Sequence, residues 1–278
     1  MRNCTIAVLL VFSLLTDRLL GQIVNPDAVT FLGAEAVAAE FKKDACAVFM
    51  ATYNTNLNEI KDWTPLGSGF FTEGTNTLVL AITCDHIVKV ASLAKKDLFV
   101  GLDTETGYLR LRANPVHRDA PNDVAVLTLS NPPGGVVMKS RAVSILLFGD
   151  ETSIVEGRGV LVIGYPLGLG FEQDKNHPIV RLGMIAQKSE GNRFLLDAVA
   201  SHGNSGSPVF SLKPSGTTFV GMIAAHAADS ITLLDENAQV AAKLPYNSGL
   251  ATAVKASVIF DAIRAANKVL TVPSTEGR

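Results

Sequence analysis

The chain has 278 residues, of which 47% are apolar and 18% are charged, with a formal net charge of −2 at pH 7 and only three cysteines. Its length allows one large domain or two small ones with a full hydrophobic core, and its positive mean hydropathy of +0.28 excludes a largely disordered chain. The near-neutral charge argues against a dedicated nucleic-acid-binding protein, and three cysteines are too few for a disulfide-rich scaffold.

Residues 1–21 have the pattern of a secretory signal peptide. Arg2 supplies a positive charge, and a mostly apolar stretch of ten residues follows from Ile6 to Leu15. Such a stretch is too short to cross ~30 Å of hydrocarbon as a helix. A signal cleaved after Gly21 is therefore favoured over a buried helix or a short membrane anchor. We expect a secreted or periplasmic protein with no stable membrane insertion once the signal is removed.

The next segment, residues 27–44, is expected to form a helix, because apolar residues such as Val29, Leu32 and Ala36 recur at steps of three and four. Beyond it, short β-branched and apolar runs are separated by Gly, Pro, Asn and Asp clusters, which is typical of strands. A Pro- and Gly-rich stretch, residues 131–135, ends this series. The predicted strands are Ala47–Asn54, Gly67–Thr72, Leu78–Thr83, Leu98–Leu102, Leu109–Ala113 and Val124–Leu129.

A second series of strands follows, and the last segment, residues 255–269, has the apolar period of a helix, with Val258, Ile259 and Ala262 on one stripe. Two series of about six strands predict an all-β protein built from two tandem six-stranded antiparallel barrels with a C-terminal helix. The predicted strands are Gly159–Gly164, Ile179–Gln187, Phe194–Ala200, Ser207–Ser211, Thr218–Ala225 and Leu250–Val254. The expected divisions are a signal peptide (1–21), a helical lead (22–45), a first barrel (46–135) and a second barrel with the closing helix (136–278).

Three local sequences carry groups suited to nucleophilic catalysis, and the last in the chain, residues 203–206, places Ser205 between two glycines. A serine hydroxyl needs a neighbouring base to act as a nucleophile, and backbone N–H donors must stabilise the oxyanion that its attack creates. Gly203 has no Cβ to block a substrate and can adopt strained backbone angles. The N–H groups of Gly203 and Ser205 are therefore a candidate oxyanion hole, the alternative being a plain polar turn between strands.

The other two sequences supply a candidate base and a candidate carboxylate. His86 follows an apolar predicted strand, and Asp123 immediately precedes another. Each position also suits a structural role, since an aspartate before a strand is usually a turn former and an imidazole at a strand end can be satisfied by its surroundings. The order His, Asp, Ser in a chain of two β series is more specific than any one of the three, because together they can supply the base, its orienting group and the nucleophile.

These motifs resemble those of trypsin-like (chymotrypsin-fold) serine peptidases, in particular the Deg/HtrA type, over residues 46–263. The resemblance implies a serine endopeptidase in which His86 is the general base, Asp123 orients it and Ser205 is the nucleophile. It implies protein or peptide substrates and no metal or other cofactor. The matching stretches are Gly67-Ser68-Gly69-Phe70, Thr83-Cys84-Asp85-His86, Asp123-Val124-Ala125-Val126-Leu127, Gly164-Tyr165-Pro166-Leu167-Gly168 and Gly249-Leu250-Ala251-Thr252-Ala253-Val254.

The sequence departs from the family pattern in three respects. Ser207 stands where the family usually has a second glycine after the nucleophile. Asn204 replaces the aspartate of digestive enzymes, so we expect no trypsinogen-like activation switch. No PDZ domain follows the closing helix in the sequence, and a stand-alone peptidase domain is therefore expected.

The resemblance also implies which segments line the pocket for the residue before the scissile bond. Val199 offers no acid for Lys or Arg, and an apolar wall favours small or medium aliphatic side chains. His226 leaves other interpretations open, because it can narrow the pocket, recognise an acidic or amide group, or simply lie on a surface loop. The predicted lining residues are Val199, Ile223, Ala224, Ala225, His226 and Gly249.

Other interpretations are weaker. His202 is three residues from Ser205 on a tight turn and is poorly placed to act as its base, and residues 164–170 lack the Lys-Ser/Thr ending of a phosphate-binding loop. The main alternative is a non-catalytic relative that binds peptides in its cleft, as a chaperone does. An unrelated esterase is disfavoured, because no Gly-x-Ser-x-Gly elbow surrounds Ser205.

Two cysteines would remain after removal of the signal, Cys46 and Cys84. They would be able to pair in an oxidising compartment, but two buried free thiols are an equally good interpretation. No Cys/His spacing resembles a zinc site.

Overall fold

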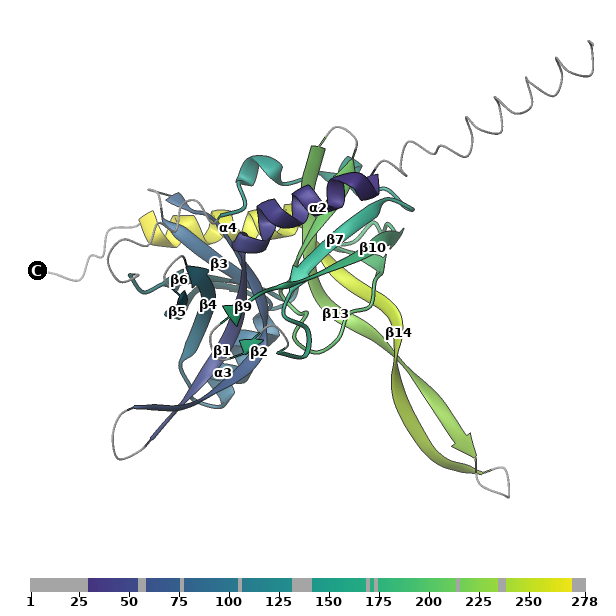
Figure 1. The fold of residues 1–278 in the computed structure, drawn as a ribbon, viewed down its shortest axis with the longest axis horizontal. Coiled ribbons are helices and arrows are strands. Elements are labelled where there is room, and N and C mark those ends of the chain that lie inside the picture. Colours follow the sequence, from purple (N-terminus) through teal and green to yellow (C-terminus); the bar gives the residue numbers. More distant parts are fainter. Residues whose placement is uncertain are drawn as a thin grey trace, which may run out of the picture.

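The computed structural model describes residues 30–54, 59–75, 78–104, 107–131, 142–168, 171–172, 175–213, 216–234 and 239–271. The predicted signal peptide and most of the predicted linker (131–135) lie outside these residues. The described strands close into two six-stranded barrels with antiparallel pairing, accompanied by a helix at each end of the described chain (Figure 1). The expected all-β fold of two tandem barrels is confirmed.

The first barrel closes in the order β1-β2-β3-β6-β5-β4. Every residue of β3 is buried, and this packing holds the end of the strand in place. A short helix, α3, follows directly. The strands and helix are β1 (Ala45–Tyr53), β2 (Ile60–Glu73), β3 (Val79–Thr83), α3 (Asp85–Leu93), β4 (Leu98–Thr104), β5 (Gly107–Asp119) and β6 (Val124–Leu129).

The helix α3 was not predicted. It has nine residues, and its buried apolar residues Ile87, Val88 and Ala91 form a stripe only about one turn long. A stripe of that length is difficult to distinguish from a strand or a loop, because helical periodicity emerges over 11 to 18 residues.

The second barrel closes in the order β10-β11-β14-β13-β12-β7. Its strands are β7 (Gly159–Gly164), β10 (Ile179–Gln187), β11 (Arg193–Asp197), β12 (Pro208–Lys213), β13 (Gly216–Leu234) and β14 (Val240–Lys255), and a separate two-stranded sheet is formed by β8 (Phe171–Glu172) and β9 (Lys175–Asn176). Short 3-10 turns lie at η2 (Lys42–Asp44), η5 (Ile145–Leu147), η6 (Glu151–Ser153) and η7 (Pro166–Gly168).

Strands β13 and β14 continue well beyond their predicted ends at Ala225 and Leu250. Their pairing runs on to Leu234 opposite Val240, and together they project from the barrel as a long hairpin (Figure 1). A two-stranded extension satisfies its backbone hydrogen bonds between its own strands and packs against no barrel core. The apolar pattern that marks a buried strand is therefore not required there.

The helices at the two ends pack on the barrels in different ways. The N-terminal helix α2 (Thr30–Phe41) contacts β7 and β12 of the second barrel, where the rings of Phe41 and Phe210 stack at 4.3 Å between centroids. The C-terminal helix α4 (Ala256–Thr271) contacts β5 and β6 of the first barrel and also β13 and β14 of the second. Helix α2 thus covers the barrel that does not adjoin it in the chain, and α4 bridges both barrels, which ties them together.

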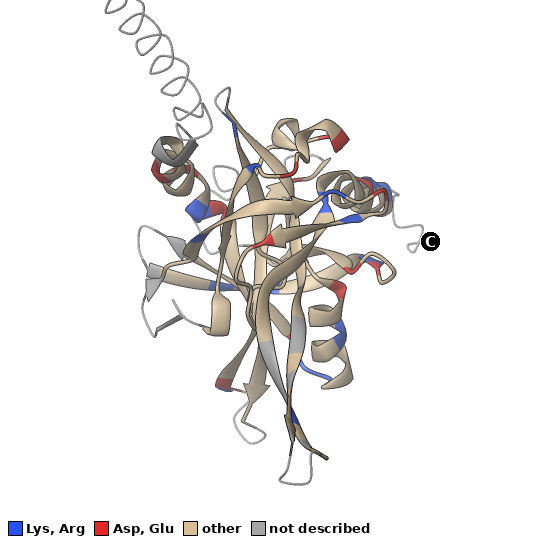
Figure 2. Cartoon of the chain, turned by 90° about the vertical axis from the view of Figure 1, so that its right-hand side faces the viewer, with Lys and Arg blue, Asp and Glu red and all other residues tan. Residues whose placement is uncertain are grey.

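The seam between the barrels is aromatic. Phe70 of β2 and Phe219 of β13 pack with ring centroids 4.9 Å apart, and Phe148 packs against Phe219 at 4.5 Å. Acidic and basic residues are scattered over both barrels and the helices (Figure 2). Among the described residues, no helix is both long enough and apolar enough to span a membrane.

Candidate active site

His86 lies in the first turn of α3, directly after the buried strand β3. Cys84 is the extended residue that caps this helix, and Asp85 in the first turn forms an ion pair with Arg118 at 2.6 Å. A negative charge at a helix N-terminus is favourable because it faces the positive end of the helix dipole. The Thr83 hydroxyl donates a hydrogen bond to the Ser68 carbonyl at 2.7 Å. The end of β3 and the helix start are therefore both anchored, and His86 is presented at the seam.

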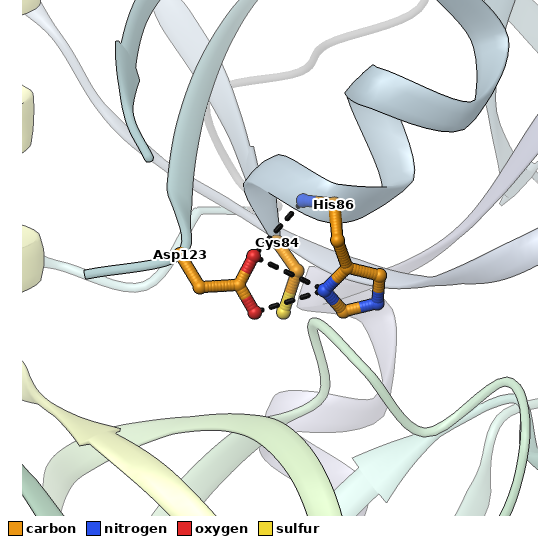
Figure 3. Close-up of side chains that lie close together, drawn as sticks. All are labelled: Cys84, His86 and Asp123. Atoms are coloured by element: carbon orange, nitrogen blue, oxygen red, sulfur yellow. Dashed lines mark hydrogen bonds and ion pairs between the residues drawn. The ribbon is translucent and has the colours of Figure 1, made fainter. Parts of the chain in front are cut away.

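Asp123 binds both the backbone and the ring of His86 (Figure 3). The His86 amide donates to Oδ1 at 2.9 Å, and Nδ1 lies 2.8 Å from Oδ2 and 3.1 Å from Oδ1. Asp123 has a φ of +61° in the turn before β6, a conformation that aspartate tolerates better than most residues. A carboxylate on Nδ1 favours the tautomer with its proton there and leaves Nε2 as the acceptor.

The surroundings keep the Asp123 carboxylate charged. Its partial burial raises its pKa, but the hydrogen bonds from the ring and amide of His86 outweigh this effect, with a further contribution from the positive charge of Arg193. The net result is a pKa of Asp123 below its ordinary value. An ionised carboxylate next to an imidazole stabilises the imidazolium that forms when the base takes up a proton.

The turn that carries Ser205 is hydrogen-bonded to both barrels. The Ser205 carbonyl accepts from the Ser68 amide of β2 at 2.8 Å, and the Gly206 amide donates to the Ile223 carbonyl of β13 at 2.8 Å. Gly206 has a φ of +92°, and a Cβ there would clash with the Ser68 carbonyl. Only glycine fits this close approach between the barrels.

Ser205 and the residues that follow His86 both lie close to Gly67 of β2. A Cβ at Gly67 would lie 2.9 Å from the Ser205 carbonyl oxygen and would clash with Ile87, the residue after His86. The Ser205 hydroxyl donates to the Ala224 carbonyl at 3.2 Å, and no hydrogen bond joins it to His86 among the described side chains. Hydrogen bonds of catalytic groups are often long or misaligned without substrate and form fully only when it binds.

Two backbone N–H groups at this turn are available to an anion. Within the described part of the chain, neither the Gly203 amide nor the Ser205 amide donates to a protein acceptor. Gly203 has a φ of +90°, and its carbonyl is held by the Ser68 hydroxyl at 2.6 Å. That hydroxyl in turn accepts from the Tyr165 amide at 2.8 Å. The conformation that leaves both amides free is thus stabilised by Ser68 of the first barrel, which also binds Tyr165 just before η7.

Ser207 is accommodated in the same turn by a glycine on β7. Its side chain is buried, and its Oγ has no hydrogen-bond partner among the described residues. A Cβ at Gly164 would clash with this Oγ. The extra hydroxyl therefore occupies space that Gly164 leaves open, and the turn keeps its shape.

The six predicted specificity residues occupy different environments. Ile223 and Ala224 are buried in β13, whereas the Val199 side chain is 59% exposed and its carbonyl is bound by Arg181. His226 is half-buried, and its ring centroid lies 5.8 Å from that of His202. Their role in substrate choice stays a prediction.

A cavity of about 290 Å³ adjoins the oxyanion loop and contains none of those six residues. It is mainly apolar in its lining, and sequence reasoning did not single out the residues of β1 and β2 that contribute to it. Gly67, the turn at 164–168 and Gly203 belonged to recognised motifs. Its lining includes Phe49, Pro65, Leu66, Tyr165, Leu167, His202 and Gly203.

The two cysteines of the described chain are free and buried. Burial raises the pKa of the Cys46 thiol, and burial together with the nearby Asp123 carboxylate raises the pKa of the Cys84 thiol. Cys84, His86 and Asp123 have potential metal-ligating atoms within 4.8 Å of one another. However, His86 and Asp123 already bind each other, and a metal ion would have to displace those hydrogen bonds and deprotonate a buried thiol.

Comparison with known proteins finds a family model and two curated relatives. A family model described as a trypsin-like peptidase domain matches residues 67–222, which is more than half of the chain. The serine protease Do-like HtrA of Bacillus subtilis (strain 168) is 28% identical over 152 residues, 52% of this chain and 30% of that protein. The probable periplasmic serine endoprotease DegP-like of Bartonella henselae is 30% identical over 146 residues, 52% of this chain and 25% of that protein. The match thus spans less than a third of the length of these relatives.

Solved structures show the same fold. The HtrA-type protease AlgW with a decapeptide aligns with a TM-score of 0.56 and 18% identity over 83% of this chain and 66% of that one. The same protease with a tripeptide aligns with a TM-score of 0.55 and 15% identity over 84% of this chain and 64% of that one.

Proposed function

Because the chain belongs to the trypsin-like peptidase domain family, we propose that it is a serine endopeptidase that hydrolyses protein or peptide substrates through an acyl-enzyme intermediate. The observation that carries this proposal is the pairing of His86 Nδ1 with Asp123 at 2.8 Å, which leaves Nε2 as a base at the seam. The free amides of Gly203 and Ser205 add the second requirement, donors for a developing oxyanion.

In the proposed mechanism, Ser205 turns from the Ala224 carbonyl toward His86 when substrate binds. Its oxygen attacks the scissile carbonyl while His86 Nε2 takes the proton, and Asp123 stabilises the resulting imidazolium. The two free amides bind the tetrahedral oxyanion. His86 then protonates the leaving amine, and water repeats the sequence to release the acyl group from Ser205.

For the substrate, we propose a small or medium aliphatic residue before the scissile bond, in a pocket formed by the predicted residues Val199, Ile223, Ala224, Ala225, His226 and Gly249. The cavity beside Gly203 contains no residue of β13, so it is a separate subsite. Its apolar lining suits a second apolar side chain of the substrate.

We propose that the protein acts outside the cytoplasm. The support is the signal-like pattern of residues 1–21, together with a relative whose name describes it as periplasmic. Mass determination of the N-terminus of the exported protein tests this, with cleavage after Gly21 expected.

The decisive experiment compares Ser205→Ala with Ser207→Ala. Ser205→Ala is expected to abolish casein cleavage and labelling by a fluorophosphonate probe, since both need the nucleophile. Ser207→Ala removes a buried hydroxyl that has no hydrogen-bond partner in the described part of the chain, and it is expected to keep both activities. Unchanged casein cleavage by Ser205→Ala would contradict the proposal. A folded wild type that no serine-directed probe labels would instead favour the non-catalytic peptide-binding alternative.

A further inference from the structure

Cys84 occupies a position next to the proposed catalytic pair that its sequence motif does not explain. It is the capping residue of α3, two residues before His86, and its side chain has no exposed surface. The sulfur lies behind the pair, within 4.8 Å of the His86 ring nitrogen and an Asp123 oxygen (Figure 3).

The thiol hydrogen-bonds across the seam between the barrels. Cys84 Sγ donates to the Ile223 carbonyl of β13 at 3.3 Å, which joins residues 139 positions apart in the chain. The same carbonyl accepts the Gly206 amide at 2.8 Å, and Gly206 directly follows Ser205. A single acceptor is therefore shared by the turn that carries the base and the turn that carries the nucleophile.

The chemical state of the thiol suits donation. Burial, the charge of the Asp123 carboxylate and a side-chain hydrogen bond with it raise the pKa of Cys84, and the Gly206 amide lowers it by less. The sulfur therefore keeps its proton at neutral pH and cannot act as a nucleophile. Arg193 is the cation that acts on both Asp123 and Cys84, and it lowers the pKa of each by a lesser amount. An S–H group is a weak donor, but here it is the side chain that links the start of α3 to β13.

We propose that Cys84 is a positioning residue that sets the separation of His86 and Ser205 by binding the start of α3 to the Ile223 carbonyl. The inference rests on the proposed endopeptidase function, because it assigns a role within that site. A hydrogen-bond donor of similar size at position 84 keeps the link to the Ile223 carbonyl and so the separation of His86 and Ser205. An apolar side chain removes this link, and the two turns can then move relative to each other.

The test compares Cys84→Ser, which keeps a donor, with Cys84→Ala, which does not. With active sites counted by a fluorophosphonate, Cys84→Ala is expected to lower kcat about tenfold at constant KM, the effect of one hydrogen bond. Cys84→Ser is expected to stay within about threefold of wild type. A purely structural role would reduce the fraction of folded protein without changing kcat per active site.

Cys46 provides the matched control. It is the other buried thiol, on β1 of the same barrel, and Cys46→Ala is expected to affect stability while leaving kcat unchanged. Wild-type kcat in Cys84→Ala, or an equal loss in Cys84→Ser and Cys84→Ala, would overturn the inference. The downfield proton resonance of His86 Nδ1–H gives a readout independent of turnover. It should shift in Cys84→Ala and not in Cys46→Ala, even if the wild type fails to label and the endopeptidase proposal itself is wrong.

Discussion

At the scale of single residues, the candidate site depends on hydrogen bonds between groups in turns, at the start of α3 and on β2. Asp123 accepts both the amide and the ring of His86, so one carboxylate fixes the position of the base and its tautomer together. Ser68 acts in the same way on the other side, since its hydroxyl joins the Gly203 carbonyl to the Tyr165 amide. The geometry of the candidate site therefore depends on the Asp123 carboxylate and the Ser68 hydroxyl, and the backbone conformation alone does not produce it.

Asp123→Asn is expected to lower kcat by about 10⁴-fold, because an amide favours the wrong tautomer of the base. It should also alter the pH dependence of stability. The pKa of Asp123 is lower in the folded chain than its ordinary value, so its contribution to stability is full above the ordinary carboxyl pKa and is lost as pH falls through the folded pKa. Urea unfolding at pH 6 and pH 3 checks this.

In that titration, the wild type is expected to lose more stability between pH 6 and pH 3 than Asp123→Asn does. Asp62→Asn is a suitable control, because Asp62 is an exposed acid for which the structure gives only a local backbone hydrogen bond. Parallel loss of stability in wild type and Asp123→Asn would contradict the linkage between Asp123 and His86.

At the scale of elements, the site forms where strands end. His86 follows β3 through the start of α3, Asp123 precedes β6, and Ser205 precedes β12. Strand ends leave backbone groups unpaired, and here those groups bind either the other barrel or, at Gly203 and Ser205, no described protein acceptor. The barrel walls supply rigidity, and the junctions between elements supply the donors and acceptors.

We expect the turn η7 to influence substrate choice, because it lines the cavity beside Gly203. Leu167 has a φ of +56°, its side chain is 62% exposed and it lines the cavity beside Gly203. Leu167→Gly should relieve the backbone strain and remove the apolar wall. We expect kcat/KM for peptides that carry leucine close to the scissile bond to fall about tenfold relative to serine-containing peptides.

Leu182→Gly removes a leucine on β10 that is also exposed and is not part of this cavity. It serves as the control, and its selectivity should match the wild type. Equal selectivity in Leu167→Gly and wild type would show that the cavity does not bind substrate.

At the scale of the whole molecule, helices from both ends of the described chain hold the two barrels in a fixed relative position. Helix α2 packs on the second barrel and α4 packs across both, and aromatic rings fill the seam between the barrels. Because the base and the nucleophile come from different barrels, the geometry of the site depends on this assembly.

Phe41→Ala is expected to destabilise the protein by about 3–5 kcal/mol, the usual effect of removing a buried phenylalanine side chain. Phe41 is 4% exposed and stacks on Phe210, so the loss should appear in urea unfolding as a lower midpoint. Lys42→Ala, at an exposed neighbouring position, should leave the midpoint unchanged. A Phe41→Ala protein as stable as the wild type would mean that α2 contributes nothing to the assembly of the barrels.

The sequence by itself determined the features that depend on local pattern. Strand periodicity predicted the two six-stranded barrels, and the turn at 203–206 and the order of His86, Asp123 and Ser205 predicted a candidate site. These signals are readable because a strand, a turn or a strand end is specified by neighbouring residues. The short helix α3 and the long hairpin of β13 and β14 escaped prediction, since one is too short for a clear period and the other packs against no barrel core.

Only the tertiary structure decided what residues distant in the chain do together. It placed the Cys84 thiol against the Ile223 carbonyl, 139 positions away, and the Ser68 hydroxyl against Gly203, 135 positions away. It also kept Cys46 and Cys84 as separate buried thiols, a question that their positions in the chain left open. Such contacts arise from closing and docking the two barrels, and no local pattern of residues encodes them.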